Sequence, residues 1–167
     1  GYGFTVCPMQ ILAFYNTIAN NGKMMRPMLI KQMKSERYGS QYMLPRELDE
    51  MVFRKEVADS LRKALTACTE KGTAKILNGM PQNVIGKTGT SRQVIDPRIR
   101  EGSIDPYRDS EGRMQYSSTF AGFFPADKPR YSIICVLFTK PPHKPLYGGQ
   151  LPTETVKSFV ENMPDLR

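Results

Sequence analysis

The sequence has few of the residues that build metal sites, disulfides or histidine-based catalysis. Its three cysteines, Cys7, Cys68 and Cys135, are too widely spaced to indicate a metal site or a redox pair, and an odd number disfavours a disulfide framework. The one histidine, His143, lies among prolines without an acidic or thiol residue close by. We therefore expect His143 to be exposed rather than catalytic.

Long apolar runs and blocks of one charge are also missing. No run is long enough to cross a bilayer, and no signal peptide is evident. The net charge of +8 comes from basic residues scattered through the chain, without the interleaved aromatic residues of a nucleic-acid surface. We expect no nucleic-acid partner. The basic surface is most simply a solvated one, and the alternative is attraction to anionic peptides or to an anionic membrane.

The 167 residues are enough for one domain with a sizeable core. Helical periodicity predicts helices at 8–20, 54–70 and 151–163, and strand patterns predict strands at 28–33, 41–44, 84–94, 117–124 and 131–138. The strand at 131–138 is the most continuously apolar, so we expect it to be buried on both faces. A polar stretch at 96–115 predicts a long loop, either a gate or simple disorder. The order of elements predicts an α+β fold, an antiparallel sheet with flanking helices.

The stretch 85–91 is the one place where small, cationic and hydroxyl residues alternate between apolar runs. On a strand, Lys87, Gly89 and Ser91 would lie on one face and Gly86, Thr88 and Thr90 on the other. Glycines leave the backbone bare, so a substrate peptide could lie along it as an added strand. Lys87 and a threonine hydroxyl would then meet a substrate carboxylate.

Two motifs contain a string of this kind. The nucleotide-binding P-loop requires a glycine at the position of Pro81, and Gly79 has the wrong spacing, so this alternative is weak. The second motif is the K-T-G element of penicillin-binding proteins and β-lactamases, which lies on a strand facing the acyl-accepting serine. Lys87-Thr88-Gly89-Thr90 matches this element completely.

The flanking segments extend the match to nearly the whole chain. They are 1–10, 18–22 with Arg26-Pro27, the Gly-Thr-Ala turn at 72–74, the segment 118–127, Pro129-Arg130-Tyr131 and the Tyr-Gly-Gly at 147–149. Together they resemble class B, monofunctional penicillin-binding proteins. One departure is Cys7, where the family usually has a threonine helix cap, and this implies a weaker cap.

The resemblance implies that residues 1–167 are the C-terminal portion of a single transpeptidase domain, because the family's S-x-N element is absent. Ser60-Leu61-Arg62-Lys63 satisfies its S-x-x-K element literally. However, these residues directly precede the K-T-G strand, whereas the family places the nucleophile much earlier. The expected apolar stripe of this helix consists of Val57, Leu61, Ala64, Leu65 and Cys68. It leaves Ser60 at its margin and Lys63 in solvent, so we interpret the match as fortuitous.

The parent protein implied by the resemblance is a serine D,D-transpeptidase that cross-links peptidoglycan and is acylated by β-lactams. Lys87 would supply positive potential, Thr88 and Thr90 would contact substrate, and the Thr90 backbone N–H would be one oxyanion donor. Gly89 and Ser91 complete the expected substrate strand, and the resemblance implies neither a metal nor an organic cofactor. The partners would be D-Ala-D-Ala stem peptides, β-lactams and the missing N-terminal half of the domain, on the extracytoplasmic (periplasmic) side of an inner membrane that anchors the parent.

The isolated chain is expected to be inactive because it lacks the nucleophile. Loss of packing partners could expose an apolar face that a homodimer would bury. The alternatives that remain are a β-lactam sensor of the same fold, a nucleotide-binding protein and a structural module without chemistry.

Overall fold

The computed structural model describes residues 5–94, 106–109, 111–139, 147 and 149–164. His143 and much of the predicted 96–115 loop lie outside these residues. Within that loop, Arg108 and Met114 form an antiparallel bridge. In the part of the chain that is described, no helix has the length and apolarity needed to cross a membrane.

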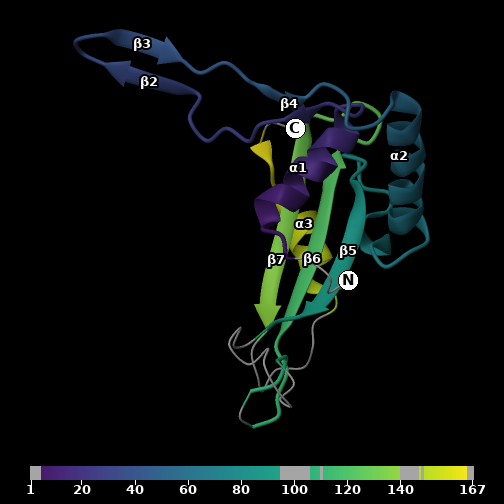
Figure 1. The fold of residues 1–167 in the computed structure, drawn as a ribbon. Helices are drawn as coiled ribbons and strands as arrows, with labels where there is room; N and C mark the ends of the chain where they lie inside the picture. Colours follow the sequence, from purple (N-terminus) through teal and green to yellow (C-terminus); the bar gives the residue numbers. More distant parts are fainter. Residues whose placement is uncertain (1–4, 95–105, 110, 140–146, 148, 165–167) are drawn as a thin grey trace.

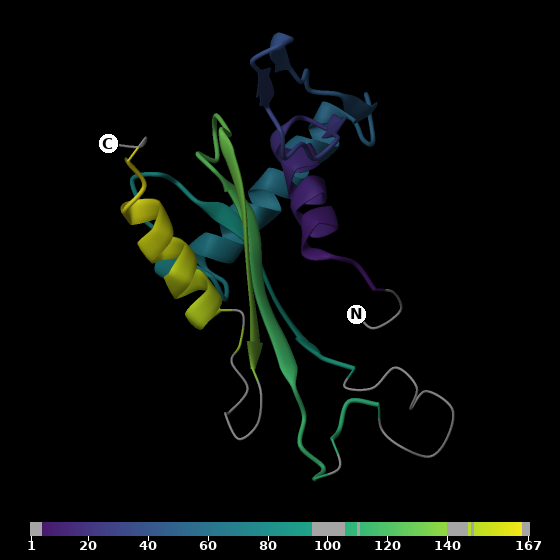
Figure 2. The ribbon, with the colours of Figure 1, turned by 90° about the vertical axis from the view of Figure 1, so that its left-hand side faces the viewer.

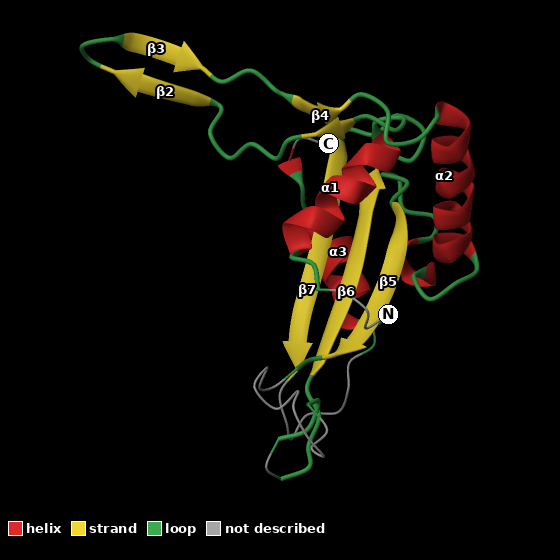
Figure 3. Cartoon of the chain, in the orientation of Figure 1, coloured by secondary structure: helices red, strands yellow, loops and turns green. Residues whose placement is uncertain are grey.

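The body of the molecule is a three-stranded antiparallel sheet (Figure 1, Figure 3). The strands are β5 (Ile85–Arg92), β6 (Tyr116–Phe124) and β7 (Tyr131–Thr139), in the order β5-β6-β7. The register pairs Ile85 with Phe123 and Phe124 with Tyr131. Both outer strands therefore have an edge that no strand in the described residues covers.

Three helices pack on this sheet: α1 (Pro8–Ala19), α2 (Lys55–Glu70) and α3 (Leu151–Glu161). A single 3-10 turn, η1 (Lys75–Leu77), follows α2. Helices α1 and α3 lie on opposite faces of the sheet (Figure 2), and α2 runs beside β5 (Figure 1). The predicted α+β fold is confirmed, and the helices cover both faces.

Strand β6 divides the core into two clusters, because successive side chains point to opposite faces. Phe123 packs with Ile18, Leu65 and Ile85 beneath α1 and α2. On the other face, Phe120 and Phe124 pack with residues of η1, α3 and the segment before β5, namely Ala74, Leu77, Met80, Val84, Val156 and Val160. Burying these aromatic rings removes a large apolar area from water and so stabilises the sheet.

An arm extends away from this body (Figure 1). At its root, β1 (Met24–Met25) pairs with β4 (Glu47–Asp49), and farther out β2 (Gln32–Ser35) pairs with β3 (Gly39–Tyr42). The sequence predicted strands at 28–33 and 41–44. The observed hairpin lies nearer the polar turn. Its pairing runs from Gln32 with Tyr42 to Ser35 with Gly39.

One burial prediction is wrong and a second is correct only in part. Strand β7 is half-buried along most of its length, and Phe138 is 63% exposed, because β7 is an outer strand of the sheet. The expected stripe on α2 is correct for Leu65, which is buried, and for Leu61 and Cys68, which pack against the core. It is wrong for Val57 and Ala64, which are exposed, and it missed Ala58 and Thr69, which are buried. The apolar periodicity of α2 therefore located only part of the helix face that packs against the sheet.

Candidate functional site

The predicted site strand forms one edge of the sheet. Strand β5 carries Ile85-Gly86-Lys87-Thr88-Gly89-Thr90-Ser91-Arg92, and among the described strands it pairs with β6 alone. Its buried end, Ile85 and Gly86, is fixed by packing, and Lys87, Gly89 and Thr90 are exposed. The residues named from the sequence thus lie together on an accessible strand edge.

Gly86 fixes the register at the buried end of β5. It lies opposite Gly122, and a Cβ on Gly86 would meet the Ala121 carbonyl and the Phe120 ring, the latter at 2.6 Å. A Cβ on Gly122 would meet the backbone of Ile85 in the same way. The paired glycines allow β5 and β6 to approach closely just before Lys87.

Lys87 and Thr88 lie on opposite faces of β5. Ile85 belongs to the cluster beneath α1 and α2, so the two-residue alternation places Lys87 on that face. The Lys87 ammonium donates a hydrogen bond to the Thr88 carbonyl at 2.9 Å. Thr88 is half-buried, and its hydroxyl forms a 2.5 Å hydrogen bond with the hydroxyl of Thr73.

Thr73 is a contact that the sequence analysis did not include among the site residues. It lies in the Gly-Thr-Ala turn after α2, and a Cβ on Gly149 would meet its carbonyl oxygen. The turn, the Thr88 side of β5 and the segment before α3 therefore meet at one point. The resemblance of this turn to the family's G-T-A was the available signal, but sequence spacing did not reveal the partnership with Thr88.

Gly89 differs from Gly86 in having free space. The nearest atom to a Cβ at this position would be the Thr119 Cβ at 3.9 Å, an ordinary van der Waals distance. Packing within this chain therefore does not require glycine here. A bare backbone at an exposed strand edge instead suits close approach by another extended chain.

Ser60 and Lys63 have the environment of surface helix residues. Both are exposed on α2, and the Ser60 hydroxyl donates to the Glu56 carbonyl at 2.8 Å. This is the usual bond of a serine within a helix. In the described part of the chain, no group of three or more His, Cys, Asp and Glu side chains is placed to hold a metal ion.

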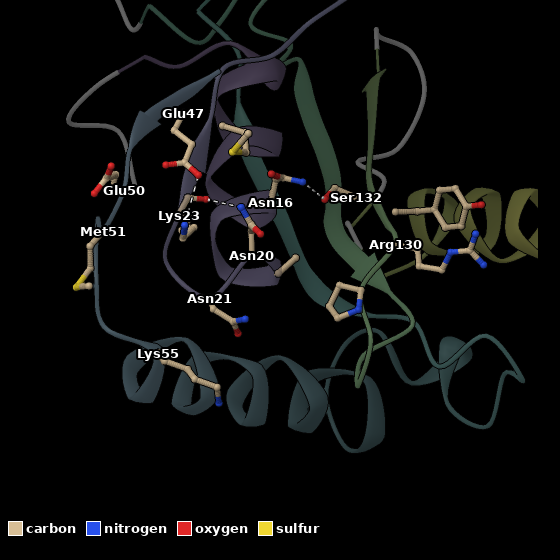
Figure 4. Close-up of a pocket in the computed structure, with 14 residues that line it drawn as sticks. Asn16, Asn20, Asn21, Lys23, Glu47, Glu50, Met51, Lys55, Arg130 and Ser132 are labelled. Atoms are coloured by element: carbon tan, nitrogen blue, oxygen red, sulfur yellow. Dashed lines mark hydrogen bonds and ion pairs between the residues drawn. The ribbon is translucent and has the colours of Figure 1, made fainter. Parts of the chain in front are cut away.

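A separate cavity of about 750 Å³ lies between α1, the root of the arm and the turn before β7 (Figure 4). Several of its polar side chains bond to one another: Asn16 donates to the Ser132 hydroxyl at 3.1 Å, and Lys23 pairs with Glu47 at 3.4 Å. The cavity does not include the Lys87–Ser91 strand. We therefore assign the K-T-G edge, and not this cavity, as the candidate active-site component.

Comparison with known proteins identifies the class. The Penicillin binding protein transpeptidase domain family matches residues 1–161. The chain belongs to this family, and the identification made from the K-T-G strand and its flanks is confirmed.

The relatives are penicillin-binding proteins of several bacteria. The chain is 31% identical over 140 residues to PbpB of Mycobacterium tuberculosis and 25% identical over 139 residues to penicillin-binding protein H of Bacillus subtilis, in both cases over 80% of its own length. It covers 19% and 18% of those proteins, about a fifth of their length.

Among solved structures, the chain is similar to penicillin-binding protein 3 of M. tuberculosis complexed with aztreonam, with a TM-score of 0.68 and 26% identity. The match covers 98% of this chain and 37% of that protein.

Proposed function

We propose that residues 1–167 are the C-terminal portion of the transpeptidase domain of a peptidoglycan D,D-transpeptidase. The observation that carries the proposal is the edge of β5, where Lys87, Gly89 and Thr90 are exposed on a strand whose other side is paired with β6. Family membership supports the same reaction class.

The proposed reaction is serine acyl transfer. A serine hydroxyl from the remaining part of the parent attacks the carbonyl carbon between the two D-alanines, and the C–N bond breaks. The terminal D-alanine leaves as an amine after taking a proton, and an acyl ester remains on the serine. An amine of a second stem peptide then attacks the ester, and the serine oxygen regains its proton.

Each residue of the strand has a proposed part in this reaction. The Lys87 ammonium supplies positive potential near the reacting centre and the substrate carboxylate. Thr88 and Thr90 offer hydroxyl groups, with Thr90 assigned to the carboxylate, and the Thr90 backbone N–H is one oxyanion donor. Gly89 leaves room for the peptide, and Ser91 extends the polar row.

We propose stem peptides ending in D-Ala-D-Ala and β-lactams as the ligands of this edge. The solved relatives include M. tuberculosis penicillin-binding protein A as penicillin G and imipenem acyl-enzyme complexes. The other proposed partner is the N-terminal half of the domain, and the edge of β7 that no described strand covers offers it a strand to pair with. The parent would act in the cell envelope, on the extracytoplasmic side, attached to the inner membrane.

The first test is intact-mass measurement after incubation with penicillin G, on this chain and on the product of the complete reading frame. We expect one penicilloyl adduct on the longer protein and none on residues 1–167. An adduct on the short chain would contradict the interpretation of Ser60 as a surface residue. Absence of an adduct on both would contradict the transpeptidase assignment.

A pair of lysine variants tests the residue roles in the longer protein. Lys87→Ala should lower the acylation rate by at least 100-fold, because it removes the charge beside the reacting centre. Lys63→Ala is the matched control, since Lys63 is also exposed but lies on α2. Equal acylation rates for the two variants would contradict the assigned role of Lys87.

A β-lactam sensor of the same fold would be acylated by penicillin in the same way. It would not release D-alanine from a stem peptide, so a D-alanine release assay distinguishes this alternative.

A further inference from the structure

The arm, residues 26–46, has a groove at its base. Backbone hydrogen bonds from Arg26 N–H to the Arg46 carbonyl and from Met43 N–H to the Lys31 carbonyl, at 2.8 and 3.0 Å, join its two segments. Between these two bonds, one side of the arm has the four residues 27–30 and the other side has only residues 44–45. The four-residue side therefore bulges outward. The resulting groove has a volume of about 860 Å³ and runs between the two segments.

The groove walls combine exposed apolar side chains with positive charge. Leu29 is 91% exposed and Leu44 79% exposed, with Met28 and Ile30 beside them. Arg26 and Arg46 line the same groove, and its lining contains no acidic residue. Over the whole arm there are five basic residues against one acid, Glu36. The groove therefore suits a segment that is apolar and acidic.

Such a segment directly follows the arm. Residues 47–52, the acidic segment, read Glu-Leu-Asp-Glu-Met-Val and contain three carboxylates and no basic residue. Leu48 is 58%, Met51 65% and Val52 42% exposed. The chain thus presents both halves of a complementary pair, and each half still exposes its apolar side chains to solvent.

The adjacency of the two patches fits two-fold symmetry. In a dimer with a two-fold axis, the groove of each copy would contact the acidic segment of the other copy, so the same contact occurs twice. Both contacts fit into one interface when the groove and the acidic segment lie side by side on each copy. Arg46 and Glu47 are consecutive, which places the boundary between the patches at this peptide bond. We propose that two copies of the chain associate here, each groove receiving the acidic segment of the other copy.

A bilayer would be a poorer occupant. The outermost residues of the arm are Glu36, Arg37 and Tyr38, so its tip carries charges of both signs. The exposed apolar side chains Met28, Leu29, Ile30 and Leu44 line the groove at the base and not this charged tip. The inference does not depend on acyl transfer, because neither patch includes a residue of β5.

Sedimentation equilibrium of the wild-type chain and of two charge-reversed variants tests the proposal. Arg26→Glu with Arg46→Glu makes the groove acidic, and Asp49→Lys with Glu50→Lys makes the segment basic. Each variant alone should weaken dimerisation at least tenfold, since like charges then meet at both contacts. An equimolar mixture should restore the dimer, because every contact again joins opposite charges.

Matched thermal unfolding curves and circular dichroism spectra establish that both variants are folded. A wild-type chain that stays monomeric at 200 µM overturns the proposal. So does a dimer that both variants retain, or a mixture of folded variants that does not associate. Binding of monomeric wild-type chain to phosphatidylglycerol vesicles would assign the arm to a lipid surface instead. Penicillin acylation of the longer protein is measured separately, so failure of dimerisation leaves the transpeptidase proposal untouched.

Discussion

Two glycines three residues apart in β5 have different physical roles. Gly86 has no room for a Cβ, whereas a Cβ on Gly89 would meet only the Thr119 Cβ, at an ordinary van der Waals distance. We predict that Gly86→Ala lowers the free energy of unfolding by about 1–3 kcal/mol through overpacking against β6. Gly89→Ala should change it by no more than about 0.5 kcal/mol. Chemical denaturation of both variants of this chain provides the measurement.

The same pair separates folding from ligand approach. In the longer protein, Gly89→Ala should slow penicillin acylation at least tenfold, because the new methyl group occupies the edge where the ligand's backbone would lie. The rate is measured by intact mass against time. Normal acylation of Gly89→Ala would remove Gly89 from the proposed substrate strand.

Tyr15 gives the fold a pH dependence on the alkaline side. It is half-buried against the cluster of Ile18, Leu65, Ile85 and Phe123, and this burial raises its pKa above the ordinary 10.0, with a smaller contribution from Cys68. A phenol that ionises less readily in the folded state leaves stability unchanged below pH 10. Stability is then lost as the pH rises from the unfolded pKa toward the higher folded pKa.

Tyr15→Phe should therefore reduce the decline in unfolding free energy above pH 10, measured by urea denaturation from pH 8 to 11. Tyr38→Phe is a suitable control because Tyr38 is 81% exposed on the arm. An identical alkaline decline in wild type and Tyr15→Phe would contradict the argument.

Among the elements, the turn after α2 is tied to β5 by the hydroxyl pair Thr73 and Thr88. Replacing either threonine with valine should cost about 1 kcal/mol, the usual net worth of a hydrogen bond. The double variant should cost less than the sum of the single variants, with a coupling energy of about 0.5–1.5 kcal/mol in a double-mutant cycle. Additive effects would mean that the two hydroxyls do not stabilise each other.

The central strand β6 and the outer strand β7 differ in how deeply their phenylalanines are buried. Phe120 is fully buried in the central strand, so Phe120→Ala should destabilise the chain by about 3–5 kcal/mol. Phe138→Ala, near the end of the outer strand, should cost less than about 1 kcal/mol because its side chain is mostly exposed. Similar losses for both variants would contradict the observed burial of the sheet.

The sequence predicted the type of the long elements and missed what depends on distant partners. Periodicity was sufficient for α1, α2, α3 and the three strands of the sheet. The two-residue β1 and three-residue β4 were missed, because strands this short carry no periodic signal. The burial of β7 was overestimated, since an apolar run does not specify whether a strand is central or at an edge. Thr73 was missed as a site contact because its partner belongs to another element.

At the scale of the whole molecule, the body and the arm differ in how their backbone is stabilised. Strand β6 is bonded on both sides, whereas β2 and β3 form an isolated two-stranded sheet. Such hairpins are marginally stable by themselves in water. We predict that amide hydrogens of β2 and β3 exchange at least 100-fold faster than those of β6 in dilute solution, measured by hydrogen exchange with mass spectrometry. Equal protection would show that the arm is held by contacts that the monomer does not contain.

The alternation of β6 has a consequence for how heat unfolds the body. Phe123 supports the core beneath α1 and α2, and its neighbour Phe124 supports the core beneath α3, so a single backbone segment is common to both. Loss of packing on one side therefore disturbs the segment that supports the other side. A calorimetric scan should accordingly contain one heat-absorption peak for both layers, with the van't Hoff and calorimetric enthalpies in agreement.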